Sequence, residues 1–225
     1  MTADNDYNTV AVPLLEAEEL SHKYGSFTAL ETLDFSLQAG EVVVVEGPNG
    51  SGKSTLLLCL SGLLRPTTGW VRVGGLDLFG EEQEARRKLA FVPDVPRFYL
   101  ELTAWEHLRF LALAHAAGKG FEARAESLLK EFGLWEARDL FPHLYSRGMS
   151  LKLGVLFALI RPFEVLLLDE PTSAMDQESS QLLVRRLIEL RDKGAGILLS
   201  THDPELKNGL ADRVLRMENG RLTPA

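Results

Sequence analysis

Residues 42–55 read Val42-Val43-Val44-Val45-Glu46-Gly47-Pro48-Asn49-Gly50-Ser51-Gly52-Lys53-Ser54-Thr55. From Gly47 onward the stretch matches the pattern G-x-x-x-x-G-K-[ST], and the apolar run before it is typical of a buried strand. Glycines let consecutive backbone N–H groups turn inward, and a helix that begins near Lys53 adds partial positive charge at its N-terminus. The stretch therefore predicts a cradle for a polyphosphate, formed by Gly47, Pro48, Asn49, Gly50, Ser51, Gly52, Lys53, Ser54 and Thr55.

Two side chains of this loop have a predicted chemical role. Lys53 would reach the β and γ phosphates of a bound nucleotide. The Ser54 hydroxyl is placed to ligate Mg²⁺, which takes oxygen ligands and keeps several waters. A glycine-rich loop that ends a strand by chance is the alternative, and the strand before it and the helix after it disfavour that alternative.

Strand and helix patterns alternate along the rest of the chain. Apolar runs at residues 41–45, 165–168 and 197–200 are separated by helical patterns at 54–64 and 177–191, which predicts an α/β fold with a mainly parallel sheet, a P-loop NTPase core. Strand-rich outer parts with Gly74-Gly75 and Asn219-Gly220 turns indicate an antiparallel β subdomain. A helical pattern at about 100–160 indicates an inserted α-helical subdomain.

Composition excludes several classes of protein. The chain has 225 residues, 45% of them hydrophobic, and a net charge of -8, so a basic surface for nucleic acid is not expected. Its single cysteine, Cys59, forms no internal disulfide and fits a reducing cytoplasm, with core packing as its expected role. No uncharged apolar run is long enough to span a membrane, and residues 1–12 read as a polar leader rather than a signal peptide.

A second motif follows the apolar run at 165–168. Asp169 and Glu170 stand at the end of this expected central strand, where parallel sheets present ligand groups. Asp169 can hold the Mg²⁺ shell through water, and Glu170 can polarise the attacking water as general base. An apolar strand capped by acids is common on its own, but behind a phosphate loop the pair indicates nucleotide hydrolysis.

With these two motifs, the chain resembles the ABC ATPase family from about Leu14 to Leu222, which implies one ATPase domain over residues 13–225. Tyr145-Ser146-Arg147-Gly148-Met149 is similar to the family signature L-S-G-G-Q. Ser146 can cap a helix whose N-terminus, with the Gly148 amide, forms a second anion site. The resemblance implies that this site closes on the γ-phosphate held by an opposite subunit.

The resemblance also assigns three further residues. Asp176 lies in a stretch that resembles the D-loop of the family, and His202 in its switch region, where it would contact the γ-phosphate. Tyr24 falls where the family places an aromatic ring against adenine; core packing is the alternative for its ring. The implied catalytic residues are Glu170, His202 and Lys53, and the implied cofactors are ATP and Mg²⁺.

Two motifs depart from the family pattern, at three positions. Asp94 stands where the family commonly has glutamine; its carboxylate can touch Mg²⁺ or its water but cannot donate a hydrogen bond. Arg147 replaces the first glycine of the signature and Met149 its glutamine. Similar variants occur in the export branch of the family, which the stretch from Asp94 to Leu108 also resembles.

The resemblance implies a motor that docks on separate transmembrane permease subunits at the inner face of the cell membrane. Two copies, or this chain with a related ATPase subunit, would sandwich two ATP molecules as a homodimer or heterodimer. Phe98, Tyr99 and Trp105 could receive a helix of the membrane partner or could belong to the core. Three other classes compete: a DNA-repair ATPase, which would need a coiled-coil insertion that is not evident, a soluble assembly factor, and a regulator that scarcely hydrolyses ATP.

Overall fold

The computed structural model describes residues 12–225, except for the side chain of Glu205. Most of the predicted leader, residues 1–12, therefore lies outside the described residues; Val12 is exposed. The helices are α1 Lys53–Leu60, α2 Glu82–Lys88, α3 Ala104–Ala114, α4 Phe121–Glu131, α5 Arg147–Leu159, α6 Gln177–Asp192 and α7 Pro204–Leu210. Within residues 12–225, no helix is both long and apolar enough to cross a bilayer.

The central sheet has the strand order β10-β9-β3-β8-β7-β6. Its strands are β3 Val42–Glu46, β6 Leu89–Val92, β7 Val165–Asp169, β8 Gly196–Ser200, β9 Arg213–Glu218 and β10 Arg221–Pro224. All neighbours in it pair in parallel except β9 and β10, a hairpin closed by Asn219-Gly220. These features confirm the predicted α/β class and the hairpin.

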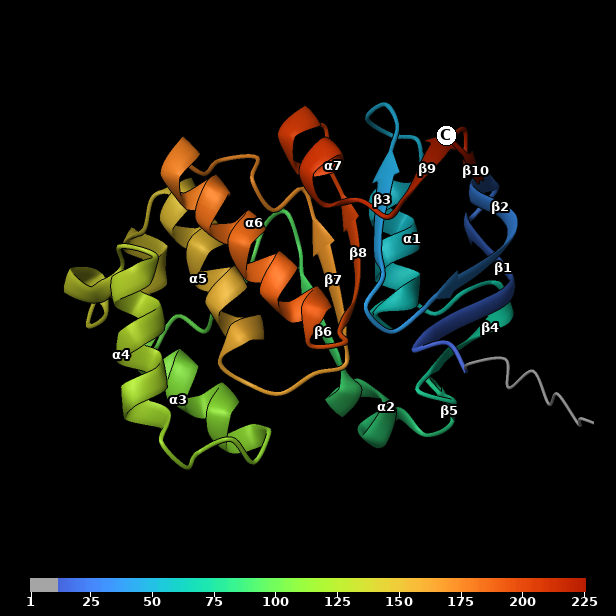
Figure 1. Cartoon of the computed structure of the whole chain (residues 1–225). Coiled ribbons are helices and arrows are strands. Elements are labelled where there is room, and N and C mark those ends of the chain that lie inside the picture. The colour runs from blue at the N-terminus through green and yellow to red at the C-terminus, as the bar shows by residue number, and fades with distance from the viewer. Residues whose placement is uncertain (1–11) are drawn as a thin grey trace, which may run out of the picture.

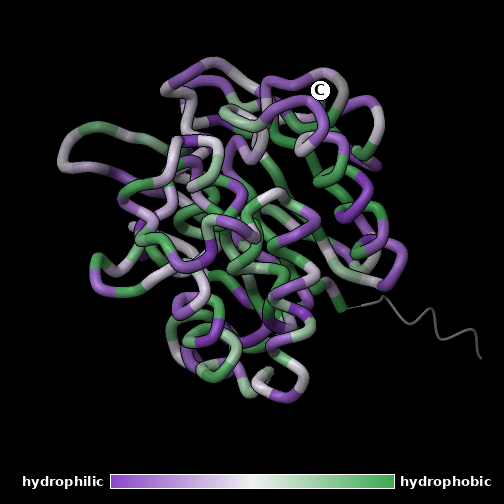
Figure 2. Tube along the Cα trace, turned by 90° about the vertical axis from the view of Figure 1, so that its left-hand side faces the viewer, coloured by the Kyte–Doolittle hydropathy of each residue, from purple (hydrophilic) through white to green (hydrophobic). Residues whose placement is uncertain are grey.

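Both faces of this sheet are covered, which explains why its strands are apolar without alternation. Side chains of Val42 and Val44 pack in one core with helices α3 to α6, and those of Val43 and Val45 pack in another with α1. Figure 1 shows these helices and α1 on opposite sides of the central strands. The hydrophobic segments gather inside the molecule and the hydrophilic ones on its outer loops (Figure 2).

A second sheet has the order β2-β1-β4-β5 and is antiparallel throughout. Its strands are β1 Leu15–Tyr24, β2 Phe27–Leu37, β4 Thr68–Val73 and β5 Leu76–Asp77. Its buried side chains share a core with α1, so this sheet lies on the α1 side of the central sheet (Figure 1). It places the β1–β2 turn, with Tyr24 and Phe27, beside the loop that precedes α1.

Helices α3, α4 and α5 occupy most of the stretch predicted as helical, and its extent as a separate subdomain, about 100–160, stays a prediction. Thr103 and Glu106 form a capping box that starts α3. Phe98 and Trp105 pack against the core, so of the three aromatics expected at a docking surface only Tyr99 is largely exposed. For Phe98 and Trp105 the structure favours the core alternative.

The register of the central sheet brings three strand ends together. Ser200 at the end of β8 pairs with Val45 of β3 on one side and with Asp169 of β7 on the other. Because parallel strands end at the same edge of a sheet, the loops after β3, β7 and β8 meet there. This edge contains the candidate site.

Candidate functional site

The loop between β3 and α1 depends on glycine at two close approaches of the backbone. Gly47 has φ 151°, and a Cβ there would lie 2.1 Å from the Met217 carbonyl oxygen. Gly52 has φ 115°, and a Cβ there would lie 2.7 Å from the Ala29 carbonyl oxygen. Other residues would displace the neighbouring strands, so these glycines fix the path of the loop.

Lys53 is wrapped by its own loop. Its side chain is 7% exposed, and its Nζ atom donates hydrogen bonds to the carbonyl oxygens of Gly47 at 2.7 Å and Pro48 at 3.3 Å. The same Nζ lies 3.3 Å from His202 Nε2 and 4.0 Å from Glu170 Oε1. A buried cation with flexible carbonyl partners is well placed to exchange them for the oxygens of an anion.

Asp169 is buried at the end of β7, and its Oδ1 atom accepts a 2.6 Å hydrogen bond from the Ser200 hydroxyl. Glu170 follows with φ 46°, an unusual conformation for a residue with a side chain, and its backbone N–H donates to Ser200. This conformation turns the Glu170 side chain toward Lys53 and His202. The two neighbouring carboxylates therefore have different environments.

Burial raises the pKa of Glu170, although His202 and Lys53 lower it in part. Its Oε1 atom lies 3.3 Å from His202 Nε2, and its Oε2 atom accepts a hydrogen bond from the His202 backbone N–H at 3.2 Å. A carboxylate whose pKa is shifted toward neutrality suits proton abstraction. Glu170 is thus the stronger candidate for a base, and Asp169, fixed by Ser200, for a ligand.

A cavity of about 480 Å³ joins most of the predicted residues. It is lined by Tyr24, Phe27, Ala29, Asn49, Gly50, Ser51, Gly52, Lys53, Ser54, Thr55, Asp94, Asp169 and Glu170. Tyr24 is 49% exposed, which contradicts the core alternative for its ring. Phe27 and Ala29 were missed by sequence reasoning; Phe27 pairs with Tyr24 across the β1–β2 turn, and only that pairing could have indicated it.

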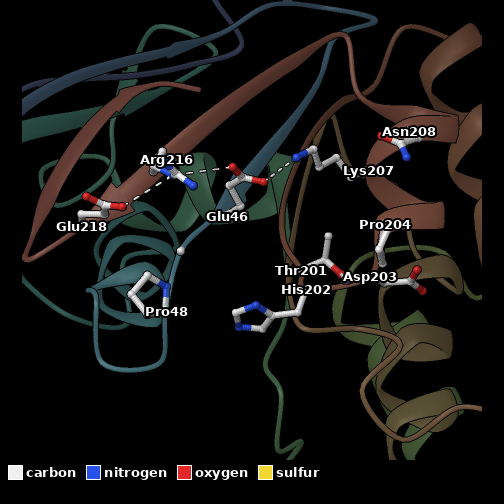
Figure 3. A pocket seen from close by; sticks show the side chains of 11 residues that line it. Glu46, Pro48, Thr201, His202, Asp203, Pro204, Lys207, Asn208, Arg216 and Glu218 are labelled. Atoms are coloured by element: carbon white, nitrogen blue, oxygen red, sulfur yellow. Dashed lines mark hydrogen bonds and ion pairs between the residues drawn. The ribbon is translucent and has the colours of Figure 1, made fainter.

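His202 and Pro48 do not line this cavity but border a second one, of about 400 Å³ (Figure 3). Glu46 lies in the middle of its wall, 2.6 Å from Lys207 Nζ and 3.8 Å from Arg216 Nε. The Lys207 hydrogen bond lowers the pKa of Glu46. Glu46 thus has two cationic partners within this cavity.

Six predicted residues do not line the larger cavity: Gly47, Pro48, His202, Ser146, Gly148 and Asp176. The last three lie at the starts of helices α5 and α6. Ser146 caps α5 by accepting a hydrogen bond from the Met149 backbone N–H at 3.2 Å, and Gly148 lies in the first turn of that helix. Asp176 caps α6 and binds Lys152 at 2.8 Å; hydrogen bonds from Lys152 and Ser179 lower its pKa. The cap predicted at Ser146 is present, and within one chain neither helix start lines the larger cavity.

Asp94 lines the larger cavity, as expected of a residue near a metal, yet its Oδ1 atom already has two partners. It accepts hydrogen bonds from Arg147 Nη2 at 3.1 Å and from the Ser173 hydroxyl at 2.9 Å. A ligand role for Asp94 would therefore need the other carboxylate oxygen or a change of partners. Cys59, in contrast, is buried in the core, and burial raises its pKa to about 12.

The larger cavity combines the groups needed to hold and cleave a phosphoanhydride. Backbone N–H groups of the loop and Lys53 can bind a polyphosphate, and the buried Ser51 hydroxyl has no hydrogen-bond partner within the described chain. Glu170 can accept a proton from an attacking water, and His202 lies within reach of the Glu170 carboxylate. The aromatic rings at the cavity edge offer a surface for a base.

Comparisons with known proteins agree with this chemistry. The family model described as ABC transporter matches residues 30–173. The chain is 35% identical to the SkfA peptide export ATP-binding protein SkfE of Bacillus subtilis, over 93% of this chain and 87% of that protein. It is 36% identical to the cobalt import ATP-binding protein CbiO of Rhodobacter capsulatus, over 93% and 77% of the two chains.

A solved structure gives the same result. The dimeric ATP-binding cassette MJ0796, in a post-hydrolysis state bound to ADP and Pi, superimposes with a TM-score of 0.83 at 25% identity, over 93% of this chain and 98% of that one. The chain therefore belongs to the ABC transporter family as one of its ATP-binding subunits, and it is an ATPase.

Proposed function

We propose that this subunit energises export through separate transmembrane subunits, by dimerising around ATP with a second copy or with a related ATPase subunit. The observation that carries the proposal is the division of the site within one chain. Lys53, Asp169, Glu170 and His202 meet around the phosphate loop, whereas Ser146 and Gly148 present a capped helix end elsewhere. A second chain would supply the missing half.

In the proposed reaction, the phosphate loop binds the triphosphate and Lys53 exchanges its carbonyl partners for phosphate oxygens. Glu170 accepts a proton from the attacking water, which becomes bonded to the γ-phosphorus as the bond to ADP breaks. His202, 3.3 Å from both Lys53 Nζ and Glu170 Oε1, would contact the γ-phosphate. Tyr24 and Phe27 would stack on adenine.

Mg²⁺ belongs to the same proposal. The Ser54 hydroxyl and the Asp169 carboxylate line one cavity, and the hydrogen bond from Ser200 fixes Asp169 with one oxygen engaged and the other available. Mg²⁺ is usually held by one or two such groups together with phosphate oxygens and water. The donor set fits, and the ion would supply charge neutralisation for the leaving phosphate.

Docking on a membrane partner is supported by an exposed apolar patch, formed by Tyr99, Leu100 and Phe110. Their exposed fractions are 59%, 67% and 49%, and the rings of Tyr99 and Phe110 lie 5.9 Å apart. Exposed apolar clusters mark interaction surfaces. The patch follows Asp94 in the chain, so contact there would adjoin the nucleotide cavity, and the chain would lie as a peripheral subunit on the inner face of the membrane.

The direction of transport, export rather than import, is the most specific part of the proposal. The variant signature at Arg147 and Met149, with the stretch from Asp94 to Leu108, resembles the export branch. One similar relative is a peptide export protein, although another is a cobalt import protein. In inside-out vesicles of the source cells, ATP added outside should therefore drive solute inward; ATP-driven loss of solute would contradict export.

Cross-linking tests the two-chain arrangement. A chain carrying Asn49→Cys and Ser146→Cys, in a Glu170→Gln background, should form covalent dimers with a short bis-maleimide only when Mg²⁺ and ATP are present. Cys59 should not react, because it is buried and its pKa is raised to about 12. Asp139→Cys, which is 73% exposed in the stretch before Ser146, replaces Ser146→Cys in the matched control.

Equal cross-linking of the control and the test pair would overturn the arrangement, as would no cross-link in a chain that binds ATP. Membrane docking is tested separately by washing membranes from the source cells. Replacing Tyr99 and Leu100 by serine should release the subunit, while Val12→Ser, also exposed, should not.

A further inference from the structure

Two of the residues that depart from the family pattern, Arg147 and Asp94, contact each other. Arg147 is the first residue of α5 and Asp94 follows β6, and 53 positions separate them in the sequence. Arg147 Nη2 donates to Asp94 Oδ1 at 3.1 Å. A charged residue at one position is thus matched by the opposite charge at the other.

The contact extends to the loop after β7. The Ser173 hydroxyl donates to Asp94 Oδ1 at 2.9 Å and lies 3.4 Å from Arg147 Nη2. The next residue of α5, Gly148, approaches this loop so closely that a Cβ would lie 2.5 Å from the Ala174 carbonyl oxygen. These contacts hold the start of α5, and with it the Arg147 guanidinium, against the residues around Asp94.

The charge of the nucleotide cavity gives this contact a role. Of the side chains that line the larger cavity, Asp94, Asp169 and Glu170 are acids and Lys53 is the cation. A bound triphosphate adds several negative charges, and a like charge nearby weakens binding. Glutamine at position 94 would be neutral, but an aspartate needs a counter-charge. Arg147 lines a smaller cavity that also touches Asp94 and Glu170, so it is close enough to provide one.

We propose that Arg147 is a positioning residue that neutralises and orients Asp94, so that the nucleotide cavity accepts an acid at this position. The inference rests on the proposed function, because it assigns the pair a role in binding ATP. Arg147 and Asp94 form one matched unit in place of the glycine and glutamine common in the family. Arg147 acts on the nucleotide through Asp94 and not by direct contact with a phosphate.

Calorimetric ATP affinity with Mg²⁺ present tests the pair in four variants of the full chain: Arg147→Ala, Arg147→Lys, Asp94→Gln and the double change Arg147→Ala with Asp94→Gln. Arg147→Ala should weaken ATP binding about two- to five-fold, the range of an exposed ion pair. Arg147→Lys should keep the wild-type affinity, and Asp94→Gln should restore it in the Arg147→Ala background. The loss should shrink at high salt and should raise KM more than it lowers kcat.

If Arg147→Ala weakens binding equally in the wild-type chain and in the Asp94→Gln variant, the proposal is overturned, because Arg147 would then act without Asp94. Unchanged affinity in every variant would also overturn it. An affinity that Lys53→Ala leaves unchanged would instead contradict the proposed function. In that case, hydrogen exchange of the nucleotide-free chain decides whether Arg147 orients Asp94. The backbone amides of residues 172–175 should exchange faster in Arg147→Ala and no faster in the double variant. Additive effects of the two substitutions would refute the proposed coupling between Arg147 and Asp94.

Discussion

The phosphate-loop end of the molecule and the start of α5 are the two proposed anion sites, but they differ in how much of a site each one completes. Around the phosphate loop, Lys53 and Asp169 are buried and hydrogen-bonded, and their partners come from the same chain. At the start of α5, the Ser146 side chain is used for the cap, and the helix end remains exposed.

This difference teaches that binding and turnover depend on different parts of the fold. The phosphate-loop half is preorganised and can bind nucleotide in one chain. In the proposed dimer, the α5 half would add its helix dipole only to a nucleotide that another chain holds. Changes in the first half should therefore affect binding or chemistry directly, whereas loss of the Ser146 cap should affect the nucleotide only in the closed dimer.

Within the phosphate-loop half, the substitution with the largest expected effect on ATP turnover is Glu170→Gln. Removal of a positioned base should slow ATP turnover by about 10² to 10⁴ while ATP binding persists. Phosphate release under saturating ATP measures the effect, and Glu178→Gln, an exposed acid in the first turn of α6, provides the matched control. Full turnover in the Glu170 variant would remove it from the mechanism.

Lys53→Ala should weaken ATP binding itself. Loss of charged hydrogen bonds to phosphate should raise Kd about 10- to 100-fold. Calorimetry checks this, with the exposed Lys193→Ala as control. Intact affinity would contradict the proposed role of Lys53 and its loop in binding the phosphates.

The pH dependence of turnover separates the two carboxylates. Burial raises the pKa of Glu170, and the base must be ionised to accept a proton. Turnover should therefore fall as pH drops through this raised pKa, by about tenfold per unit below it, and level off above it. Rates measured at saturating ATP should show this acidic fall in the wild type but not in Glu170→Gln. If the fall persists in the variant, another group causes it.

Ser146→Ala should have the smallest effect on a single chain. Loss of the cap should lower the free energy of unfolding by about 1 kcal/mol. ATP affinity of the separate chain should stay within about two-fold of wild type, since Ser146 lies outside the larger cavity. Urea unfolding and calorimetry measure both quantities, with Ser150→Ala inside α5 as control; a strong loss of single-chain affinity would contradict the division of the site.

The phosphate loop and the Asp169-Glu170 pair could be predicted because their chemistry lies in short contiguous stretches that follow apolar strands. The mainly parallel sheet that joins them agrees with the prediction for the same reason: continuous apolar runs belong to strands covered on both faces. The helix boundaries agree less closely with the prediction, because α1 ends at Leu60 and not at the predicted Leu64. Its end coincides with a turn at Ser61 and Gly62, where Gly62 has φ 74°.

Contacts between distant segments could not be predicted. Asp94 and Arg147 each stood out as a departure, but nothing local indicates that they meet across 53 positions. Phe27 reaches the nucleotide cavity only because the β1–β2 register pairs it with Tyr24. Phe98 and Trp105 are aromatic residues of the kind found at docking surfaces. Only their packing, Phe98 against Phe157 and Trp105 against Phe121, identifies them as core residues.

The central claim, that one chain holds only half of a working site, is tested most directly by sedimentation of the chain over a range of concentrations, together with its rate of ATP turnover. The account predicts that the Glu170→Gln variant becomes a dimer when Mg²⁺ and ATP are added, and that wild-type turnover per chain rises with chain concentration. A wild-type chain that stays monomeric with ATP bound, and turns it over at a full rate independent of concentration, would contradict the account.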